Sequence, residues 1–186
     1  MSTQAEPPVD QASIDDRLPS MGAVFFDRVR KTPDAEAYRF PDGAGQWTSR
    51  TWAQTGEEVT RVAAGLIALG VEPEQRVAIA SSTRYEWIVS DLAIVASGAA
   101  TTTVYPSTIA ADVVYIVADS DSVVVFAEDD GQIAKLRDQR DKLPDVSKVV
   151  TFDGTPDEGD DPWVITLATL RGDGREASQR APVGSR

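Results

Sequence analysis

The sequence predicts an α/β fold, an open and mostly parallel sheet with helices on both faces. Apolar runs typical of strands that are buried on both sides alternate with segments of helical periodicity from about residue 76 to residue 152. Residues 76–108 form the clearest unit, because a strand, a helix and a second strand follow one another there. A unit of this length makes a right-handed crossover between parallel strands.

The chain opens with residues 1–19, which are polar and acidic and are expected to form a disordered lead. They lack the apolar core of a signal peptide. Ser20 can cap a helix that ends before Pro33. Residues 36–51 predict a hairpin, since two weakly alternating stretches flank the turn residues 41–43.

A long helix follows the hairpin. Thr51 or Thr55 can cap it, and Gly70 can end it, because glycine leaves a helix in a left-handed conformation without steric cost. Residues 77–80 then predict a buried strand, and any hydroxyl of residues 81–83 can cap the next helix. The apolar face of the long helix is predicted to consist of Val59, Val62, Ala63, Leu66 and Ile67.

Residues 85–96 carry apolar side chains at the spacing of one helical face, and Gly98 can end that helix. Residues 100–105 are rich in threonine and valine and predict a strand that Pro106 ends. Thr108 is a candidate cap for a further helix.

Residues 122–126 (SVVVF) are the least ambiguous strand in the chain. Asp129 or Asp130 can start a helix that Pro144 stops, and residues 148–152 predict another strand.

Three segments complete the chain. The acidic residues 153–162 are expected to form a solvated linker, and residues 163–170 a short strand or helix that docks. Residues 171–186 are polar and without period, and they predict an irregular tail. We therefore expect one α/β unit over residues 20–170.

Composition excludes several classes of chemistry. The 186 residues carry a formal net charge of −12 and contain neither cysteine nor histidine. Nucleic acid is disfavoured as a partner because its phosphates would be repelled. A chain without these residues has no thiolate nucleophile, no Ser–His pair and no disulfide. No apolar run reaches the roughly 18 residues of a membrane helix, so we expect a cytoplasmic protein without a transmembrane segment.

The turn at residues 81–83 is a candidate anion site, because it leaves a strand and opens a helix whose free N–H groups point outward. Capping is the competing interpretation and fits any such turn. The flanking Arg84 and Glu86 are expected to be solvated. The two glycines of residues 43–45 lie in the hairpin turn, where turn geometry explains them better than phosphate binding.

The remaining candidates favour structural roles. Glu57 and Glu58 are adjacent in a helix and cannot converge on one site. The acidic residues 153–161 lack the order of a calcium loop, so a linker is favoured over a weak cation site. Packing is expected for Trp47, Trp52, Trp87 and Trp163. The residues alone assign no catalytic, cofactor-binding or metal-binding position.

Two stretches resemble the amino-terminal signatures of the AMP-forming adenylating enzymes, which include acyl-CoA synthetases, luciferases and peptide-synthetase adenylation domains. The first combines residues 50–54 (RTWAQ) with residues 63–71 (AAGLIALGV). The second combines residues 92–99 (LAIVASGA) with residues 104–108 (VYPST).

Residues 82–87 (STRYEW), 115–120 (YIVADS) and 124–128 (VVFAE) are most similar to the long-chain fatty acid–CoA ligases of actinobacterial type. The resemblance covers about residues 20 to 170. It implies the incomplete N-terminal subdomain of the adenylate-forming fold.

Such a relative would use ATP and Mg²⁺ to convert a fatty acid to acyl-AMP and pyrophosphate, and coenzyme A would then displace AMP. The family's phosphate loop ends in a lysine that follows proline or glycine. Lysines occur here only at Lys31, Lys135, Lys142 and Lys148, and none has such a neighbour. We therefore expect a truncated fragment that is inactive alone and holds no cofactor, whose parent enzyme could lie at the membrane periphery.

The alternative is a free-standing, non-catalytic α/β binding or interaction module. A fragment should leave an apolar face uncovered and self-associate through it, whereas an independent module should stay monomeric.

Overall fold

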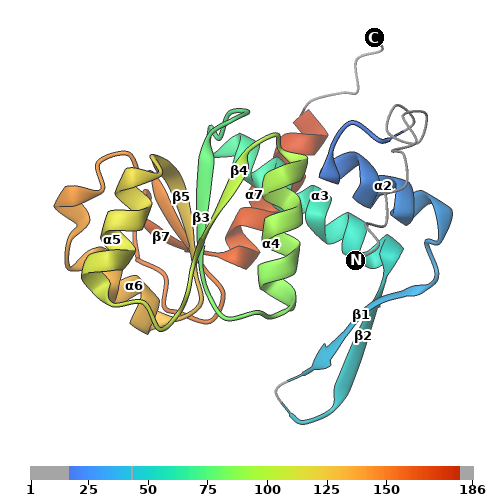
Figure 1. Cartoon of the computed structure of the whole chain (residues 1–186), viewed down its shortest axis with the longest axis horizontal. Coiled ribbons are helices and arrows are strands. Elements are labelled where there is room, and N and C mark those ends of the chain that lie inside the picture. Colours follow the sequence, from blue (N-terminus) through green and yellow to red (C-terminus); the bar gives the residue numbers. More distant parts are fainter. Residues whose placement is uncertain (1–16, 43, 181–186) are drawn as a thin grey trace, which may run out of the picture.

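A central parallel sheet lies between two groups of helices (Figure 1), and its strands bury apolar side chains on both faces. The computed structural model describes residues 17–42 and 44–180, with side chains as far as Gly174. Within these residues the sheet has the strand order β4-β3-β5-β6-β7, and all neighbouring strands are parallel. The strands are β3 (Arg76–Ala80), β4 (Ala100–Val104), β5 (Ser122–Ala127), β6 (Lys148–Thr151) and β7 (Val164–Thr166).

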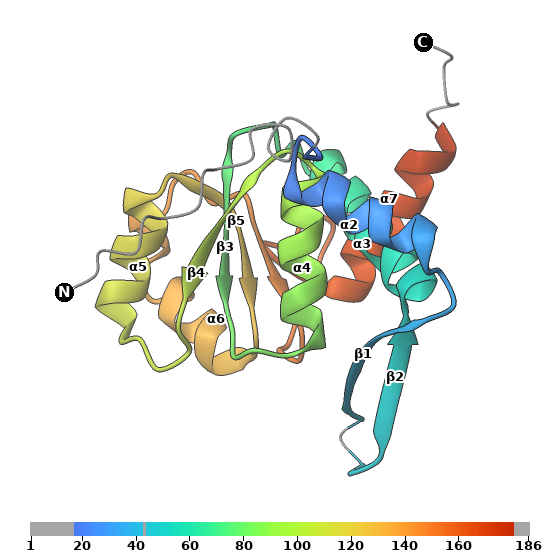
Figure 2. The ribbon, with the colours of Figure 1, turned by 45° about the vertical axis from the view of Figure 1, so that its right-hand side comes forward.

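Helices cover both faces of this sheet, as Figure 2 shows. Val77 and Ile79 of β3 point into the core beneath one layer of helices, whereas Ala78 and Ala80 point beneath the other, because side chains alternate along a strand. The first layer contains α3 (Trp52–Ala68), α4 (Tyr85–Ala96) and α7 (Leu167–Arg180), with α2 (Met21–Lys31) outside it. The second layer contains α5 (Ala110–Asp119) and α6 (Asp130–Arg137), and the short 3-10 helix η1 (Arg140–Lys142) follows α6. The predicted fold class is confirmed.

Three predicted helix caps are present. The Ser20 side chain accepts the Ala23 N–H at 3.1 Å, and Asp129 accepts the Gln132 N–H at 3.0 Å. Thr51, rather than Thr55, starts α3 and forms a reciprocal capping box with Gln54. The predicted Thr108 cap is wrong. Ile109 is the N-cap of α5 and offers no side-chain bond, while the Thr108 carbonyl accepts a hydrogen bond from Lys135 at 2.8 Å.

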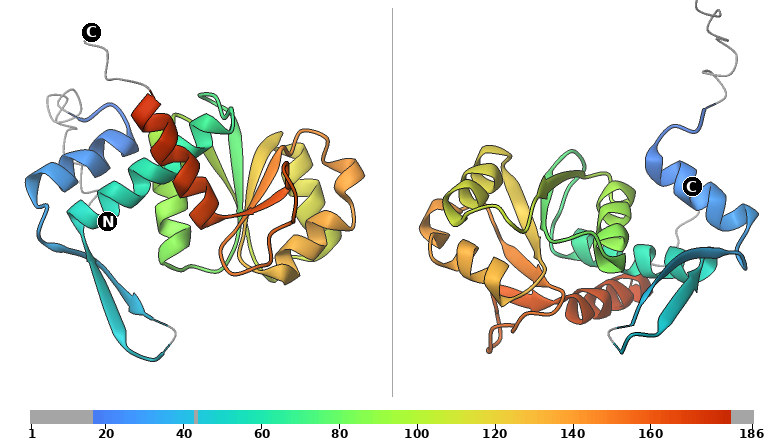
Figure 3. Two further views of the ribbon diagram at one scale, coloured as in Figure 1. Left: turned by 180° about the vertical axis from the view of Figure 1, so that it is seen from behind. Right: turned by 60° about the horizontal axis from the view of Figure 1, so that its bottom comes forward.

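The predicted hairpin is present and extends away from the sheet (Figure 3). Its strands are β1 (Glu36–Pro41) and β2 (Trp47–Thr51), which pair antiparallel. The Phe40 ring stacks on Tyr85 of α4 with ring centroids 4.4 Å apart. An isolated two-stranded hairpin is marginally stable in water, so this aromatic contact with the body helps to hold it.

The prediction of an irregular tail over residues 171–186 is wrong for residues 171–180, which continue helix α7. Two glycines, Gly174 in α7 and Gly65 in α3, let these helices approach each other closely, and Figure 3 shows the two helices from behind. A Cβ on Gly174 would lie 2.2 Å from the Arg61 carbonyl oxygen, and one on Gly65 would lie 2.3 Å from the Leu170 carbonyl oxygen. Residues 181–186 and most of the predicted disordered lead lie outside the described residues.

The acidic residues 153–162 are mostly exposed, as expected of a solvated linker, but specific bonds fix several of them to other elements. Asp157 accepts the backbone N–H of Val164 at 3.0 Å and pairs with Arg137 at 2.7 Å. Burial raises the pKa of Asp157, but these hydrogen bonds lower it by more, so the net pKa lies below its usual value. Lys148 donates to Asp161 and to the Pro162 carbonyl. These cations and N–H groups come from other elements of the fold.

Replacing Gly65 by alanine should force α3 and α7 apart and lower the free energy of unfolding by about 1–3 kcal/mol. The matched control is Gly172→Ala in the same helix pair, because a Cβ added at Gly172 would have no other atom within 4 Å. That control should be neutral or stabilise by up to about 1 kcal/mol through helix propensity. Urea unfolding followed by circular dichroism measures both, and equal effects would contradict the close approach.

Candidate functional site

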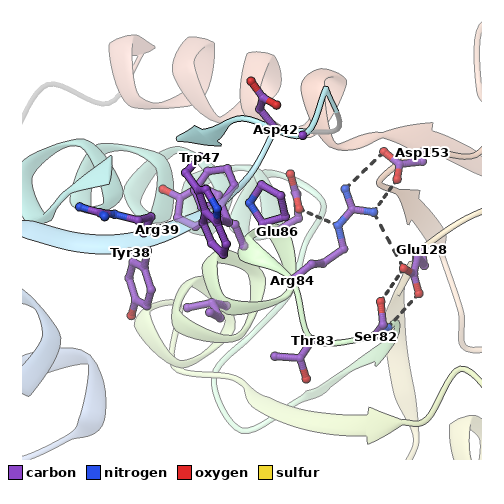
Figure 4. Close-up of a pocket in the computed structure, with 15 residues that line it drawn as sticks. Tyr38, Arg39, Asp42, Trp47, Ser82, Thr83, Arg84, Glu86, Glu128 and Asp153 are labelled. Atoms are coloured by element: carbon purple, nitrogen blue, oxygen red, sulfur yellow. Dashed lines mark hydrogen bonds and ion pairs between the residues drawn. The ribbon is translucent and has the colours of Figure 1, made fainter. Parts of the chain in front are cut away.

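A cleft of about 1050 Å³ lies at the carboxyl ends of the sheet strands. The hairpin forms one wall through residues 38–47, and the turn after β3 with the start of α4 forms the floor through residues 82–88. Glu128 after β5 and Asp153 after β6 complete it (Figure 4). Four separate segments therefore converge on one end of the sheet.

The topology explains the position of this cleft. From β3 the chain crosses by α4 to β4 on one side, and then by α5 to β5 on the other side of β3. The connections thus diverge between β3 and β5, which leaves a crevice outside their carboxyl ends. Ligands of doubly wound sheets bind at such crevices.

The chain's own Glu128 carboxylate binds the turn at this crevice. Its oxygens accept the Ser82 backbone N–H at 2.8 Å and the Ser82 hydroxyl at 2.6 Å. The prediction that a hydroxyl of residues 81–83 caps α4 is wrong, because Arg84 is the N-cap residue and makes no side-chain cap. The alternative prediction, an anion site, needs a free N–H group in this turn. The N–H group of Ser82 is instead bonded to the Glu128 carboxylate of the same chain.

Arg84 and Glu86 are not solvated as the sequence predicts, because both side chains are largely covered, with 27% and 29% exposed. The Arg84 Nε donates to Glu86 at 2.7 Å, and its guanidinium also bonds to Asp153 and lies 4.0 Å from Glu128. Burial lowers the pKa of Arg84, but the bonds to Asp153 and Glu86 raise it by more, so the net pKa lies above its usual value. We call Ser82, Arg84, Glu86, Glu128 and Asp153 the strand-end network.

Aromatic side chains line the hairpin side of the cleft, which faces the strand-end network. Tyr85 is buried between Phe40 and Tyr38, and its hydroxyl oxygen lies 3.3 Å from the Thr55 hydroxyl. Burial raises the pKa of Tyr85 to about 12. The prediction that the tryptophans pack is wrong for Trp47, which is 70% exposed and lines the cleft.

The other tryptophans pack as expected. Trp163 is buried and donates its indole N–H to the Val146 carbonyl at 3.0 Å. Trp52 and Trp87 pack against the core that lies beneath α3, α4 and α7.

The charges of the cleft do not suit a phosphate group. The lining residues that the structure describes include two guanidiniums, and both are already paired: Arg84 with carboxylates of the strand-end network and Arg39 with Glu36 at 2.8 Å. Asp42 adds a further carboxylate and is bonded to the N–H groups of Ala44 and Gln46. A phosphate would have to compete with these carboxylates for each cation.

Other candidate groups have structural partners. Glu57 pairs with Arg61 at 3.0 Å, and Glu58 lies 3.5 Å from Arg171. Among the described residues no group of three or more acidic side chains could hold a metal ion. No helix in that same part of the chain is long and apolar enough to cross a membrane.

Glu128→Ala should remove the acceptor for both Ser82 donors and lower the free energy of unfolding by about 1–3 kcal/mol. The matched control is Glu57→Ala, because the Glu57 side chain is 69% exposed in a surface pair and its loss should cost less than about 0.5 kcal/mol. Urea unfolding measures both, and an equally small effect for Glu128 would show that the network does not stabilise the fold.

The buried Tyr85 should make unfolding dependent on alkaline pH. Its pKa is about 12 in the folded chain against 10.0 when exposed, so the unfolded state loses this proton first. Stability is therefore fully present below pH 10 and falls as the pH rises toward 12. In Tyr85→Phe the slope of unfolding free energy against pH should be shallower. Part of the slope should remain, because burial also raises the pKa of Tyr38. Tyr115→Phe, at a 65% exposed position, should leave the slope unchanged.

Known proteins with similar sequences are found for this chain. The chain is 36% identical over 137 residues to the long-chain-fatty-acid–CoA ligase FadD15 of Mycobacterium bovis, which covers 73% of the chain and 22% of that relative. The chain thus spans about a fifth of the length of FadD15. An uncharacterised protein of Mycobacterium tuberculosis, Rv1549, is 31% identical over 76% of the chain and 77% of its own length.

The fold also matches a solved structure. The anthranilate CoA ligase AuaEII in complex with anthranoyl-AMP superposes with a TM-score of 0.73 and 20% identity, over 83% of this chain and 29% of that one. The family model described as AMP-binding enzyme matches residues 25–174. These findings confirm the resemblance seen in the sequence, and they show that the chain belongs to the AMP-binding enzyme family.

Proposed function

We propose that this chain forms the amino-terminal part of a long-chain fatty acid–CoA ligase fold. The observation that carries the proposal is the 36% identity to FadD15 over 137 residues, which is 73% of this chain. In the complete enzyme a fatty acid and ATP would form acyl-AMP and pyrophosphate, with Mg²⁺ stabilising the phosphate charge, and the thiol of coenzyme A would then displace AMP. The sheet and the cleft at its carboxyl ends would then serve as scaffold and wall for sites that other segments complete.

We further propose that these residues do not activate fatty acids by themselves. None of the lysines lines the cleft, and each has a local partner. Lys135 donates to the Pro106 and Thr108 carbonyls, and Lys148 to Asp161. Lys31 pairs with Asp27 and Lys142 with Gln139. Among the described residues, no lysine ammonium group is thus available in the cleft to stabilise the charge that develops during phosphoryl chemistry.

A free-standing binding module is the second candidate. It is favoured by the match to Rv1549, which this chain covers over 77% of its length, against 22% for FadD15. Such a module would bind a partner without ATP. The two candidates differ in whether adenylate-type ligands contribute to binding.

Incubation with ATP, Mg²⁺ and palmitate should release no pyrophosphate above a blank without palmitate. FadD15 assayed in parallel is the positive control. Turnover above the blank would overturn the proposal of inactivity, provided that it also survives in a chain purified by a second route. Tight calorimetric binding of ATP or palmitoyl-AMP to the isolated chain would likewise contradict a scaffold role.

A further inference from the structure

The two edges of the sheet differ in how their backbone groups are satisfied. At one edge, β7 has only three residues, and the acidic loop lies along it. Asp157 accepts the Val164 N–H through its side chain at 3.0 Å and donates its own N–H to the Val164 carbonyl at 2.9 Å. The chain therefore covers this edge with its own residues.

The opposite edge is β4, which pairs only with β3 among the residues that the structure describes (Figure 2). The Ala100 N–H donates to the Gln75 carbonyl at 2.8 Å, so Ala100 and every second residue after it direct their backbone groups toward β3. Thr101 and Thr103 consequently direct their N–H and carbonyl groups outward. This is the arrangement that templates the addition of another strand.

None of the usual protections against strand addition is found in β4. Its sequence, Ala-Thr-Thr-Thr-Val, contains no charge and no proline, and its register with β3 has no bulge. Three exposed apolar side chains occur on the segments that follow the strand: Tyr105 directly after it, Ile109 at the N-cap of α5 and Tyr115 in α5, at 74%, 65% and 65% exposure. Among the described residues, the outward backbone groups of β4 therefore have no strand partner, and the residues that follow the strand add exposed apolar side chains.

We propose that β4 pairs antiparallel with β4 of a second copy of this chain, so that two sheets join into one. A two-fold axis through the edge would set Thr103 opposite Thr103 of the other copy and Tyr105 beside Thr101. Thr–Thr and aromatic–β-branched neighbours both favour cross-strand pairing. The same axis would bring the α5 helices of the two copies together on one face.

A second copy fits this edge better than a charged partner would. The strand itself offers no charge for recognition, whereas its side-chain pattern is complementary to itself in the antiparallel direction. A five-residue strand provides a small interface, so the dimer should be weak and dependent on concentration. Each copy carries a net charge of −12, and this repulsion should be screened by salt.

The test is sedimentation equilibrium of the full chain from about 10 µM to about 1 mM, in which a reversible dimer is expected. Thr103→Lys sets two ammonium groups opposite each other and should weaken dimerisation by roughly fivefold, and Thr103→Glu should do the same with two carboxylates. An equimolar mixture of the two variants should restore association, because opposite charges then face each other. Ala68→Lys, at an exposed position on α3, is the charge control and should leave dimerisation unchanged.

Circular dichroism and the urea midpoint check that each variant is folded. A chain that stays monomeric over the whole concentration range would overturn the proposal. A dimer that the Thr103 variants do not weaken, or whose variants do not associate when mixed, would also overturn it. Raising NaCl from about 0.05 to about 0.5 M should strengthen the dimer, and a weaker dimer at high salt would indicate a charged interface instead.

Discussion

The fold depends on burying both faces of its central strands. β3 and β5 must be apolar on both sides, and the crossover helices α4 and α5 cover opposite faces of the sheet. Because the carboxyl ends of parallel strands all lie at one end of the sheet, this arrangement brings the turns after β3, β5 and β6 close together. The cleft and the strand-end network therefore follow from how the core is covered, and the chemistry of those turns decides what the place can do.

Much of this architecture could be predicted from local pattern. The strand at residues 122–126, the helix at residues 85–96 and the Thr51 cap depend on neighbours close in sequence, and such signals are visible in the chain itself. Local pattern misassigns the turn at residues 81–83 because its partner, Glu128, lies 46 residues from Ser82. Arg84 and Asp153 are separated by 69 residues, so no local pattern could join them. A glycine such as Gly174 is misleading for a related reason, since helix propensity does not reveal that a second helix needs the space of a missing Cβ.

The family to which the chain belongs and the charges that line its cleft are separate observations. The chain belongs to the AMP-binding enzyme family, and the family model matches residues 25–174, which include every strand of the sheet. Its cations, however, are already engaged: the guanidiniums of the cleft by carboxylates and the lysines by carbonyls, side-chain amides or acids elsewhere. Electrostatic stabilisation needs cations or N–H donors that are preorganised toward the reacting group and not toward the protein itself. The same contacts that stabilise this unit thus occupy the guanidinium groups that line its cleft.

The asymmetry of the sheet edges has a consequence for assembly. A molecule with one open edge can form a closed pair and then stop growing, because the pairing uses up the available edge. At the β7 edge, Asp157 occupies both outward backbone groups of Val164, the N–H through its carboxylate and the carbonyl through its own backbone N–H. Asp157 therefore marks the boundary between a finite assembly and open-ended polymerisation, because a chain in which both edges accepted strands could add copies without limit.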